Sequence, residues 1–578
     1  MRWILVVVAS LAVPACGQDV PSALAPDAIY HSGHVLTVDE PFSVAEAFAV
    51  KDDRFIAVGT NADVQALAGA DTQQVDLAGQ TVIPGLMDNH HHVIWNARLM
   101  NRGIDMVGVP SLEEMLSRLR QAAAKAAPGE VVVASGGWNP RDFAEGRGPT
   151  RQDLDEAVPN NPLMMFTRGR NNAHLNSVAL AQLGIDRTTL DWGSFPILRD
   201  DETGEPSGML SGGEQVVAAD FLMLPQPPLD EHIAWLEKEQ QQELAKGLTV
   251  SRELVLPVEY MRIYAEMHRQ QRLKMRVSMG LMFGVQHVDG WSPLQIDRML
   301  ADLPPFPGLG DDMLQFDGSV AEFEATTQRV STWNRTPYPP DSNNVGLSIA
   351  RWPHSPLLQV VRDDEGQFYG IHRLPTEMFH DVVKKMNRYG YRPAFHISGN
   401  AALDWHLDAY EAADRELPIA GKRWVAEHAT SRGADAEQIE RLAKLDLILS
   451  LQQRNNPARS LLDRGLTLTL GSDFPAGDSN PFAIMSYYVT RRDALGEIVE
   501  PLSEAITREE ALRMYTINNA YLMFWEDRLG SIEAGKLADF VILSDDILSV
   551  PDEQIKDLHP LATYVGGRQV YAREGGGF

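Results

Sequence analysis

The chain is poor in cysteine and in basic residues. Its 578 residues include one cysteine, Cys16, so no intramolecular disulfide can form. Lysine and arginine total 51 against 79 aspartates and glutamates, which gives a net charge of −28. Because a surface that binds phosphates has to be basic, this balance argues against a nucleic-acid partner. An ordinary acidic, hydrated surface is the simpler interpretation.

The chain also lacks a long apolar run near its start. Residues 3–13 are apolar, but they are too few to span a bilayer as a stable helix and have the form of a secretory signal. The small residues before Cys16 resemble a bacterial lipoprotein signal, although Pro14 departs from the usual pattern. We therefore expect a signal peptide over residues 1–16 and a tether over residues 17–27. The protein would be exported to the periplasm or cell envelope of a bacterium and would contact the membrane only through a lipid on Cys16, with ordinary signal-peptidase cleavage as the alternative.

Both ends of the remaining chain are rich in short strand-like runs. Between residues 28 and 83, and again between residues 528 and 578, β-forming segments are broken by Gly, Asp and Asn. Residues 562–571 are typical of a hairpin that turns at Gly566 and Gly567. We expect residues 28–83 and 528–578 to form one small β-sandwich domain.

Residues 84–527 alternate predicted strands with predicted helices. The strands are residues 130–135, 163–166, 248–251, 275–279, 392–396, 424–428, 447–450 and 466–473. This alternation indicates parallel βαβ units and favours a closed (β/α)8 barrel of the TIM type, with an open doubly wound sheet as the alternative. No glycine-rich fingerprint follows the first of these strands, so a dinucleotide site lacks support.

Three consecutive histidines follow an apolar strand and a Pro-Gly step in residues 82–92. Alternate residues of a strand share a face, so His90 and His92 can converge on one point while His91 points away. Two neutral imidazoles directed at one point begin a divalent metal site. A histidine-rich loop that binds no metal is the alternative.

Other polar residues follow apolar strands at similar positions, namely His396, His428 and Asp473. In a (β/α)8 barrel, catalytic side chains gather at the C-terminal ends of the strands. One such histidine alone could be a cap or a buried hydrogen-bonding group. Four imidazoles and a carboxylate in this regular placement favour a site for Zn or a similar metal, with an open position for water.

These motifs resemble those of the amidohydrolase superfamily, specifically its family-3 branch, which includes N-substituted formamide deformylases. The motifs that carry the resemblance are residues 84–92, 396–400, 427–429, 471–475 and 529–540. The resemblance implies that His90 and His92 bind the metal from the first strand and His396 from the fifth. Asp473, from the eighth, would contact the metal and take the proton from its water. His428, from the sixth, would either bind a second metal or polarise the substrate carbonyl.

One position departs from the family pattern. Binuclear members often carry a carboxylated lysine at the end of the fourth strand, which we expect within residues 313–327, and this window has no lysine. It holds Asp317, Glu322 and Glu324 instead. Glu322 and Glu324 would share a face of a strand, and one of them, Glu322 in our choice, could bridge two metals. We favour one metal ion over two.

Three further residues are candidates for substrate binding. Trp138 follows the predicted strand 130–135, and Arg168 and Arg170 follow the strand 163–166. An arginine near the barrel mouth could bind a substrate carboxylate bidentately, whereas surface salt bridges are the alternative.

We therefore predict a metal-dependent hydrolase that cleaves a non-peptide C–N bond, of the amide or formamide type, in a small-molecule substrate by metal-activated water. A hydrolase for lactones, esters or carbamates would use the same site. The alternative that is not an enzyme is an exported binding lipoprotein with an inactive barrel. The missing lysine in the fourth strand is the observation that favours this alternative. The sequence leaves a homo-oligomer open.

Overall fold

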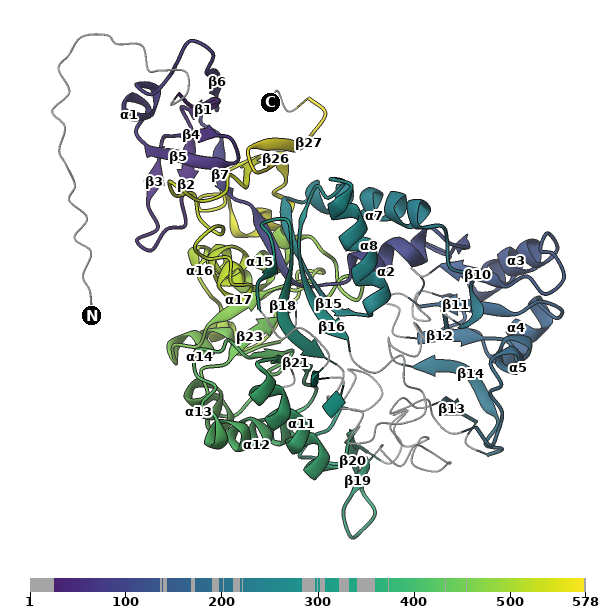
Figure 1. The fold of residues 1–578 in the computed structure, drawn as a ribbon. Helices are drawn as coiled ribbons and strands as arrows, with labels where there is room; N and C mark the ends of the chain where they lie inside the picture. Colours follow the sequence, from purple (N-terminus) through teal and green to yellow (C-terminus); the bar gives the residue numbers. More distant parts are fainter. Residues whose placement is uncertain are drawn as a thin grey trace.

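The fold is known from a computed structural model (Figure 1). It describes residues 25–575 with several internal segments left out. These segments are residues 136–137, 139–142, 168–171, 190–196, 201, 212–218, 221, 283–296, 299, 302–306, 322–331, 340–358, 373, 432 and 454. None of the helices in the described part has the length and apolar content needed to cross a membrane. The signal peptide, the tether to residue 24 and the lipid on Cys16 lie outside the described residues and stay predictions.

Parallel strands form a nearly closed barrel at the centre of the molecule (Figure 1), which confirms the predicted fold class. In order around the barrel, which is also chain order, they are β8 (Leu86–His91), β15 (Leu248–Leu256), β16 (Arg276–Met282), β18 (Leu314–Ala321), β21 (Arg392–His396), β22 (Val425–Glu427), β23 (Ile448–Leu451) and β24 (Leu468–Leu470). The short β17 (Leu309–Gly310) pairs beside β18. A parallel bridge between His91 and Phe474 brings the first strand to the segment that follows the last.

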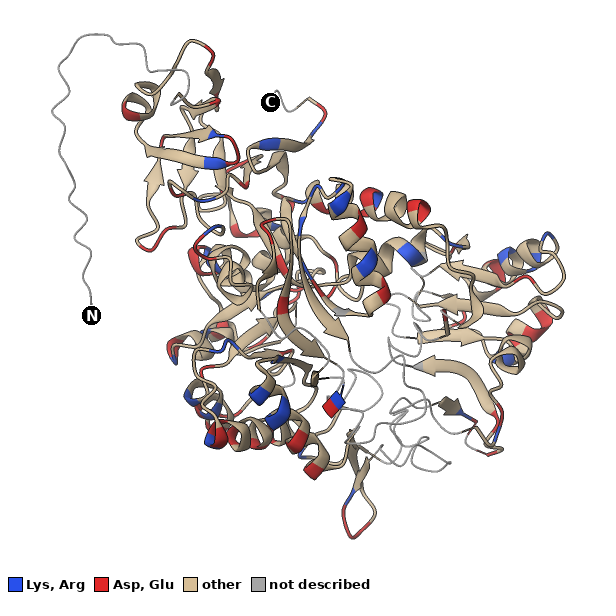
Figure 2. Cartoon of the chain, in the orientation of Figure 1, with Lys and Arg blue, Asp and Glu red and all other residues tan. Residues whose placement is uncertain are grey.

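Helices follow most of the barrel strands. They are α2 (Val93–Met100), α7 (Leu229–Leu244), α8 (Val258–Arg269), α11 (Thr376–Tyr389), α12 (Asn400–Glu416), α13 (Ala436–Lys444), α14 (Ala458–Asp463), α15 (Pro481–Thr490), η2 (Leu502–Glu504), α16 (Arg508–Tyr515) and α17 (Ile517–Leu522). In α11 the buried Phe379, Val383 and Met386 recur at helical spacing, and the helix ends at Gly390 with φ 83°. Lysines and arginines lie among aspartates and glutamates on the outer helices α11–α13 (Figure 2).

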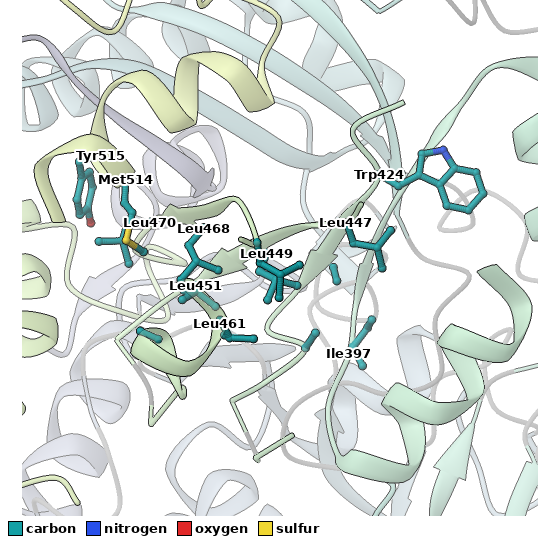
Figure 3. Close-up of a cluster of buried hydrophobic side chains, with 14 of the residues drawn as sticks. Ile397, Trp424, Leu447, Leu449, Leu451, Leu461, Leu468, Leu470, Met514 and Tyr515 are labelled. Carbon is teal, nitrogen blue, oxygen red and sulfur yellow. The ribbon is translucent and has the colours of Figure 1, made fainter. Parts of the chain in front are cut away.

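The two faces of the barrel wall differ in chemistry. On β23 and β24, Leu449, Leu468 and Leu470 belong to the core cluster between the strands and the outer helices (Figure 3). The alternate residues Ser450 and Thr469 are fully buried and hydrogen-bond with side chains of other barrel strands. The period-two alternation of a strand thus places leucine outside the barrel and polar groups inside it.

A separate α/β unit is inserted between β8 and β15. Its sheet has the order β13-β14-β12-β11-β10-β9. The elements are β9 (Ile104–Asp105), α3 (Leu112–Ala123), β10 (Val132–Ser135), α4 (Arg151–Ala157), β11 (Leu163–Phe166), β12 (Asn172–Leu175), α5 (Ser177–Gln182), β13 (Ile197–Arg199) and β14 (Pro206–Ser211). The strands predicted at 130–135 and 163–166 therefore form, but their assignment to the barrel is wrong. They pair in parallel with each other, so their apolar pattern matches that of a barrel strand.

The two ends of the described chain share one sheet, as predicted, because β7 pairs antiparallel with β25. One sheet has the order β5-β4-β1-β6 and the other β27-β26-β25-β7-β2-β3. The elements are β1 (Ala28–His31), β2 (His34–Leu36), β3 (Val44–Ala45), β4 (Ala47–Lys51), β5 (Arg54–Gly59), α1 (Asn61–Gln65), β6 (Gln73–Asp76), β7 (Thr81–Pro84), β25 (Phe540–Leu543), η3 (Asp552–Asp557), β26 (Pro560–Val565) and β27 (Arg568–Ala572). Tyr30 and Phe48 of one sheet pack on Phe540 of the other. A further hairpin, β19 (Gln359–Arg362) and β20 (Phe368–His372), lies between β18 and β21 in the chain.

The two sheets built from the ends of the chain form the β unit of the molecule. A buried ion pair joins the barrel to this β unit. Arg276 of β16 donates through Nε and Nη2 to the two carboxylate oxygens of Asp539, at 2.8 Å each. Neither side chain is more than 3% exposed. Removing one partner of such a pair leaves the other charge buried without compensation.

We expect Arg276→Met to lower the free energy of unfolding by about 3 kcal/mol, since Asp539 would keep its charge in a dry environment. The matched control is Arg269→Met, whose arginine pairs with Glu266 at the surface, and it should change stability by less than about 0.5 kcal/mol. Urea unfolding of the two variants checks this, and equal effects would show that the buried pair does not hold the two units together.

Candidate metal centre

The side chains predicted at the strand ends lie together at the C-terminal ends of the barrel strands. Ligand atoms of His90, His396 and His428 all lie within 4.8 Å of one another, and so do those of His90, His92 and Asp473. His90 belongs to both groups. Its ring centroid lies 5.1 Å from those of His92 and His396 and 4.8 Å from that of His428.

Closure of the barrel brings Asp473 to the histidines. Its backbone N–H donates to the carbonyl of His90 at 2.9 Å, and the N–H of His92 donates to the carbonyl of Phe474 at 3.0 Å. As a result, Asp473 Oδ1 lies 3.6 Å from His90 Nε2 and 3.7 Å from His92 Nε2, and Asp473 Oδ2 lies 3.9 Å from His428 Nε2. Asp473 and His428 both adopt left-handed φ angles, 58° and 59°. Such angles are uncommon outside glycine and cluster at functional sites.

His90 is held by a buried carboxylate. Its Nδ1 lies 2.9 Å from Glu427 Oε2, and the other oxygen of Glu427 accepts from Arg252 Nη1 at 2.8 Å. Burial opposes ionisation of Glu427, but the hydrogen bond from His90 and the charge of Arg252 outweigh it and hold the pKa of this carboxyl well below its usual range. Burial also lowers the pKa of His90, which favours the neutral ring. His90 therefore donates from Nδ1 and turns the lone pair of Nε2 toward the cluster.

The chemistry of these donors fits a divalent metal ion. His90 Nε2 is fully buried and makes no hydrogen bond with the described residues, a state that is rare for a polar atom in a folded protein. His92 is oriented in the same way, since its Nδ1 lies 3.2 Å from the carbonyl of Leu254, which can only accept. Neutral imidazoles and a carboxylate are the ligands of Zn and similar metals.

His91 faces away from this cluster, as the alternation predicts. Its Nδ1 lies 3.0 Å from Ser251 Oγ, and its Nε2 lies 3.5 Å from Glu243 of the outer helix α7. Burial lowers the pKa of His91, but Asp88, Glu243 and Glu253 outweigh it and raise the pKa to about 9. A ring that binds a carboxylate on the outer side of the wall helps to fix the strand end without taking part in the cluster.

Comparison with known proteins is consistent with this geometry. Residues 73–571 match the amidohydrolase family. The chain belongs to the amidohydrolase family. It is 28% identical to an N-substituted formamide deformylase of Arthrobacter pascens over 95% of this chain and 99% of that protein. It is 27% identical to the protein LONG AFTER FAR-RED 3 of Arabidopsis thaliana over 95% of this chain and 92% of that protein. An uncharacterized metal-dependent hydrolase from Pyrococcus horikoshii OT3, at 19% identity, shares the fold with a TM-score of 0.65 over 91% of this chain and 99% of that chain.

These matches confirm the resemblance inferred from the motifs, and they identify the chain as an enzyme of this family. The family match covers the barrel and also β6, β7 and β25–β27 of the two terminal sheets, so the resemblance does not depend on the histidine motif alone.

The fourth barrel strand of this amidohydrolase carries a carboxylate that is already paired. Asp317 Oδ2 accepts from Arg252 Nε at 2.6 Å and lies 3.2 Å from Arg392 Nη2, and its Oδ1 accepts from the backbone N–H of Ser319 at 2.7 Å. With both oxygens engaged, Asp317 is not available as a metal ligand. Glu322 and Glu324 lie outside the described residues, so a bridging role for Glu322 stays a prediction.

The structure gives Trp138 a packing role. Its side chain is 1% exposed and stacks on Phe143, with ring centroids 5.7 Å apart and planes 8° apart. It belongs to the core of the inserted unit, so it presents almost no surface to a substrate, contrary to the prediction. Arg168 and Arg170 lie outside the described residues, and their binding of a substrate stays a prediction.

Sequence reasoning missed the buried groups behind the cluster. Arg252, Glu427 and Gln452 are at most 2% exposed, and each contacts a histidine of the cluster or a partner of one. A signal was available for the charged pair, because Arg252 directly follows the predicted barrel strand 248–251, and an arginine buried there has to find a partner.

We expect Asp317→Asn to leave the number of bound metal ions per chain unchanged. The variant should be less stable by about 3 kcal/mol, because Arg252 and Arg392 would lose the carboxylate that they share. Elemental analysis of the purified variant, together with urea unfolding, checks both statements. The loss of one ion equivalent would instead make Asp317 a ligand.

Proposed function

We propose that this amidohydrolase hydrolyses a non-peptide C–N bond of the amide or formamide type in a small-molecule substrate, with one divalent metal ion, most simply Zn. The observation that carries the proposal is the convergence of four imidazoles and Asp473 at the C-terminal ends of the barrel strands. Similarity to a formamide deformylase over nearly the full length of both proteins supports the choice of bond.

His90, His92 and Asp473 are the residues that would hold the ion, with His396 and His428 beside them. When bound, a divalent metal in such a site supplies Lewis acidity and makes water reactive near neutral pH. Glu427 and the carbonyl of Leu254 keep the Nδ1 atoms of His90 and His92 protonated, so both rings present a lone pair at Nε2.

Asp473 is the residue placed to move the proton. Its carboxylate lies within 3.9 Å of three imidazole Nε2 atoms, and its side chain keeps 10% exposure, whereas that of His90 has none. Its carboxylate would accept a proton from the attacking water and return it to the nitrogen of the leaving amine. The products are then an amine and a carboxylate, or formate where the acyl group is formyl.

Asp473→Asn should lower kcat by about 10²- to 10⁴-fold, because the amide cannot accept the proton of water, while most of the metal stays bound. Asp478→Asn is the matched control, since Asp478 is exposed on the same loop, and it should leave kcat unchanged. Steady-state kinetics with metal analysis of each variant checks this. Equal rates for wild type and Asp473→Asn would exclude Asp473 as the base.

Hydrolases for lactones, esters or carbamates would use the same residues, so the bond has to be tested directly. We expect metal-loaded protein to hydrolyse N-formyl and N-acyl amines faster than lactones, esters and carbamates with matched substituents. A screen of these classes, with and without chelator, measures the preference. Faster turnover of a lactone or ester would overturn the amide assignment, and no metal-dependent turnover of any class would count against the whole proposal.

A further inference from the structure

The hydrogen-bond partner of His428 differs in kind from those of the other histidines. Its Nδ1 contacts the side-chain amide oxygen of Gln452, which follows β23 and is 2% exposed. The partners of His90 and His92 are a carboxylate and a backbone carbonyl, which can only accept a hydrogen bond. An amide has a donor end as well as an acceptor end. The position of the proton on His428 therefore depends on which end of Gln452 faces it.

The orientation of the Gln452 amide is set by a buried chain of hydrogen bonds. Its Nε2 donates to Ser450 Oγ at 3.0 Å, and Ser450 Oγ donates to Asn89 Oδ1 at 3.1 Å. Asn89 Nδ2 donates to Thr469 Oγ1 at 2.5 Å, and Thr469 Oγ1 donates to the carbonyl of Leu449 at 3.1 Å. Ser450, Asn89 and Thr469 are fully buried, so no solvent competes for these bonds.

The backbone at both residues is held as well. The carbonyl of Gln452 accepts from the hydroxyl of Tyr488 at 2.5 Å, and the N–H of His428 donates to the carbonyl of Ser450 at 3.2 Å. Turning the amide over would point its oxygen at Ser450 Oγ, whose one proton goes to Asn89 Oδ1, and would leave Ser450 Oγ without its donor.

We propose that Gln452 is a positioning residue that keeps the proton of His428 on Nδ1 and directs the Nε2 lone pair into the cluster, so that His428 is a metal ligand and not a hydrogen-bond donor to the substrate carbonyl. A neutral imidazole has one N–H, and the amide oxygen of Gln452 uses it. Nε2 lies 3.9 Å from Asp473 Oδ2, and a ligand atom of His428 lies within 4.8 Å of those of His90 and His396. The inference rests on the proposed function, because it assigns a role within the same site.

Three variants test the proposal, with metal affinity as the readout. Gln452→Met removes the acceptor and should weaken Zn binding by about 10- to 100-fold. Gln452→Glu keeps an oxygen facing Nδ1, and Ser450 Oγ can turn its one proton from Asn89 Oδ1 to the other carboxylate oxygen, so the Zn affinity should stay within about 3-fold of wild type. Ser450→Ala keeps Gln452 but removes the hydroxyl that orients the amide. We expect its loss of Zn affinity to lie between those of Gln452→Glu and Gln452→Met.

Gln315→Met is the matched control. Gln315 is a buried glutamine near the opposite end of the barrel wall, at the start of β18, and its Nε2 donates to the carbonyl of Met523 at 2.5 Å. The exchange should lower stability without changing Zn affinity. Affinity is measured by competition with a chromophoric chelator, and the visible spectrum of the Co-loaded proteins reports a changed ligand set in Gln452→Met.

The outcomes separate the possible failures. Wild-type Zn affinity in Gln452→Met, or an equal loss in Gln452→Glu and Gln452→Met, would overturn the positioning role. If Gln452→Met does not fold, Ser450→Ala decides, and an unchanged affinity there would overturn the role of the hydrogen-bond chain. Wild-type protein that binds neither Zn nor Co would instead refute the proposed function.

Discussion

The candidate site depends on the hydrogen bonds that close the barrel between its first strand and the segment after its last. The N–H of Asp473 donates to the carbonyl of His90, and the N–H of His92 donates to the carbonyl of Phe474. The carboxylate of Asp88 also accepts from the N–H of Ser472 at 3.1 Å. These bonds place residues almost 400 positions apart in the chain side by side. Without them the carboxylate would have no fixed relation to the histidines.

Below the cluster, the barrel interior is filled with paired charges. Arg252 contacts Asp317 and Glu427, and Arg392 contacts Asp317, so two cations face two anions. Each group is at most 2% exposed, and any one of them without a partner would be costly to bury. The network ends at His90, through Glu427. The ion pairs that compensate the buried charges therefore also orient the His90 ring of the candidate site.

Sequence pattern was sufficient for the parts of the site that follow strand ends. The alternation in a strand separates His90 and His92 from His91, and the structure places them on opposite sides of the wall. Sequence pattern was not sufficient to find the buried partners of these histidines. The strand that faces Arg252 is set by closure of the barrel and not by the local sequence. For the same reason, residues 130–135 could be recognised as a parallel strand but not assigned to the right sheet.

The most direct test of the account is an anomalous diffraction measurement at the zinc edge on crystals of the Zn-loaded protein. We expect one peak per chain, within about 2.0–2.2 Å of the Nε2 atoms of His90, His92 and His428 and of a carboxylate oxygen of Asp473. The Nδ1 atoms of both rings should still face Glu427 and the carbonyl of Leu254. No peak among these residues, or a peak bound through Nδ1 of His90, would contradict it.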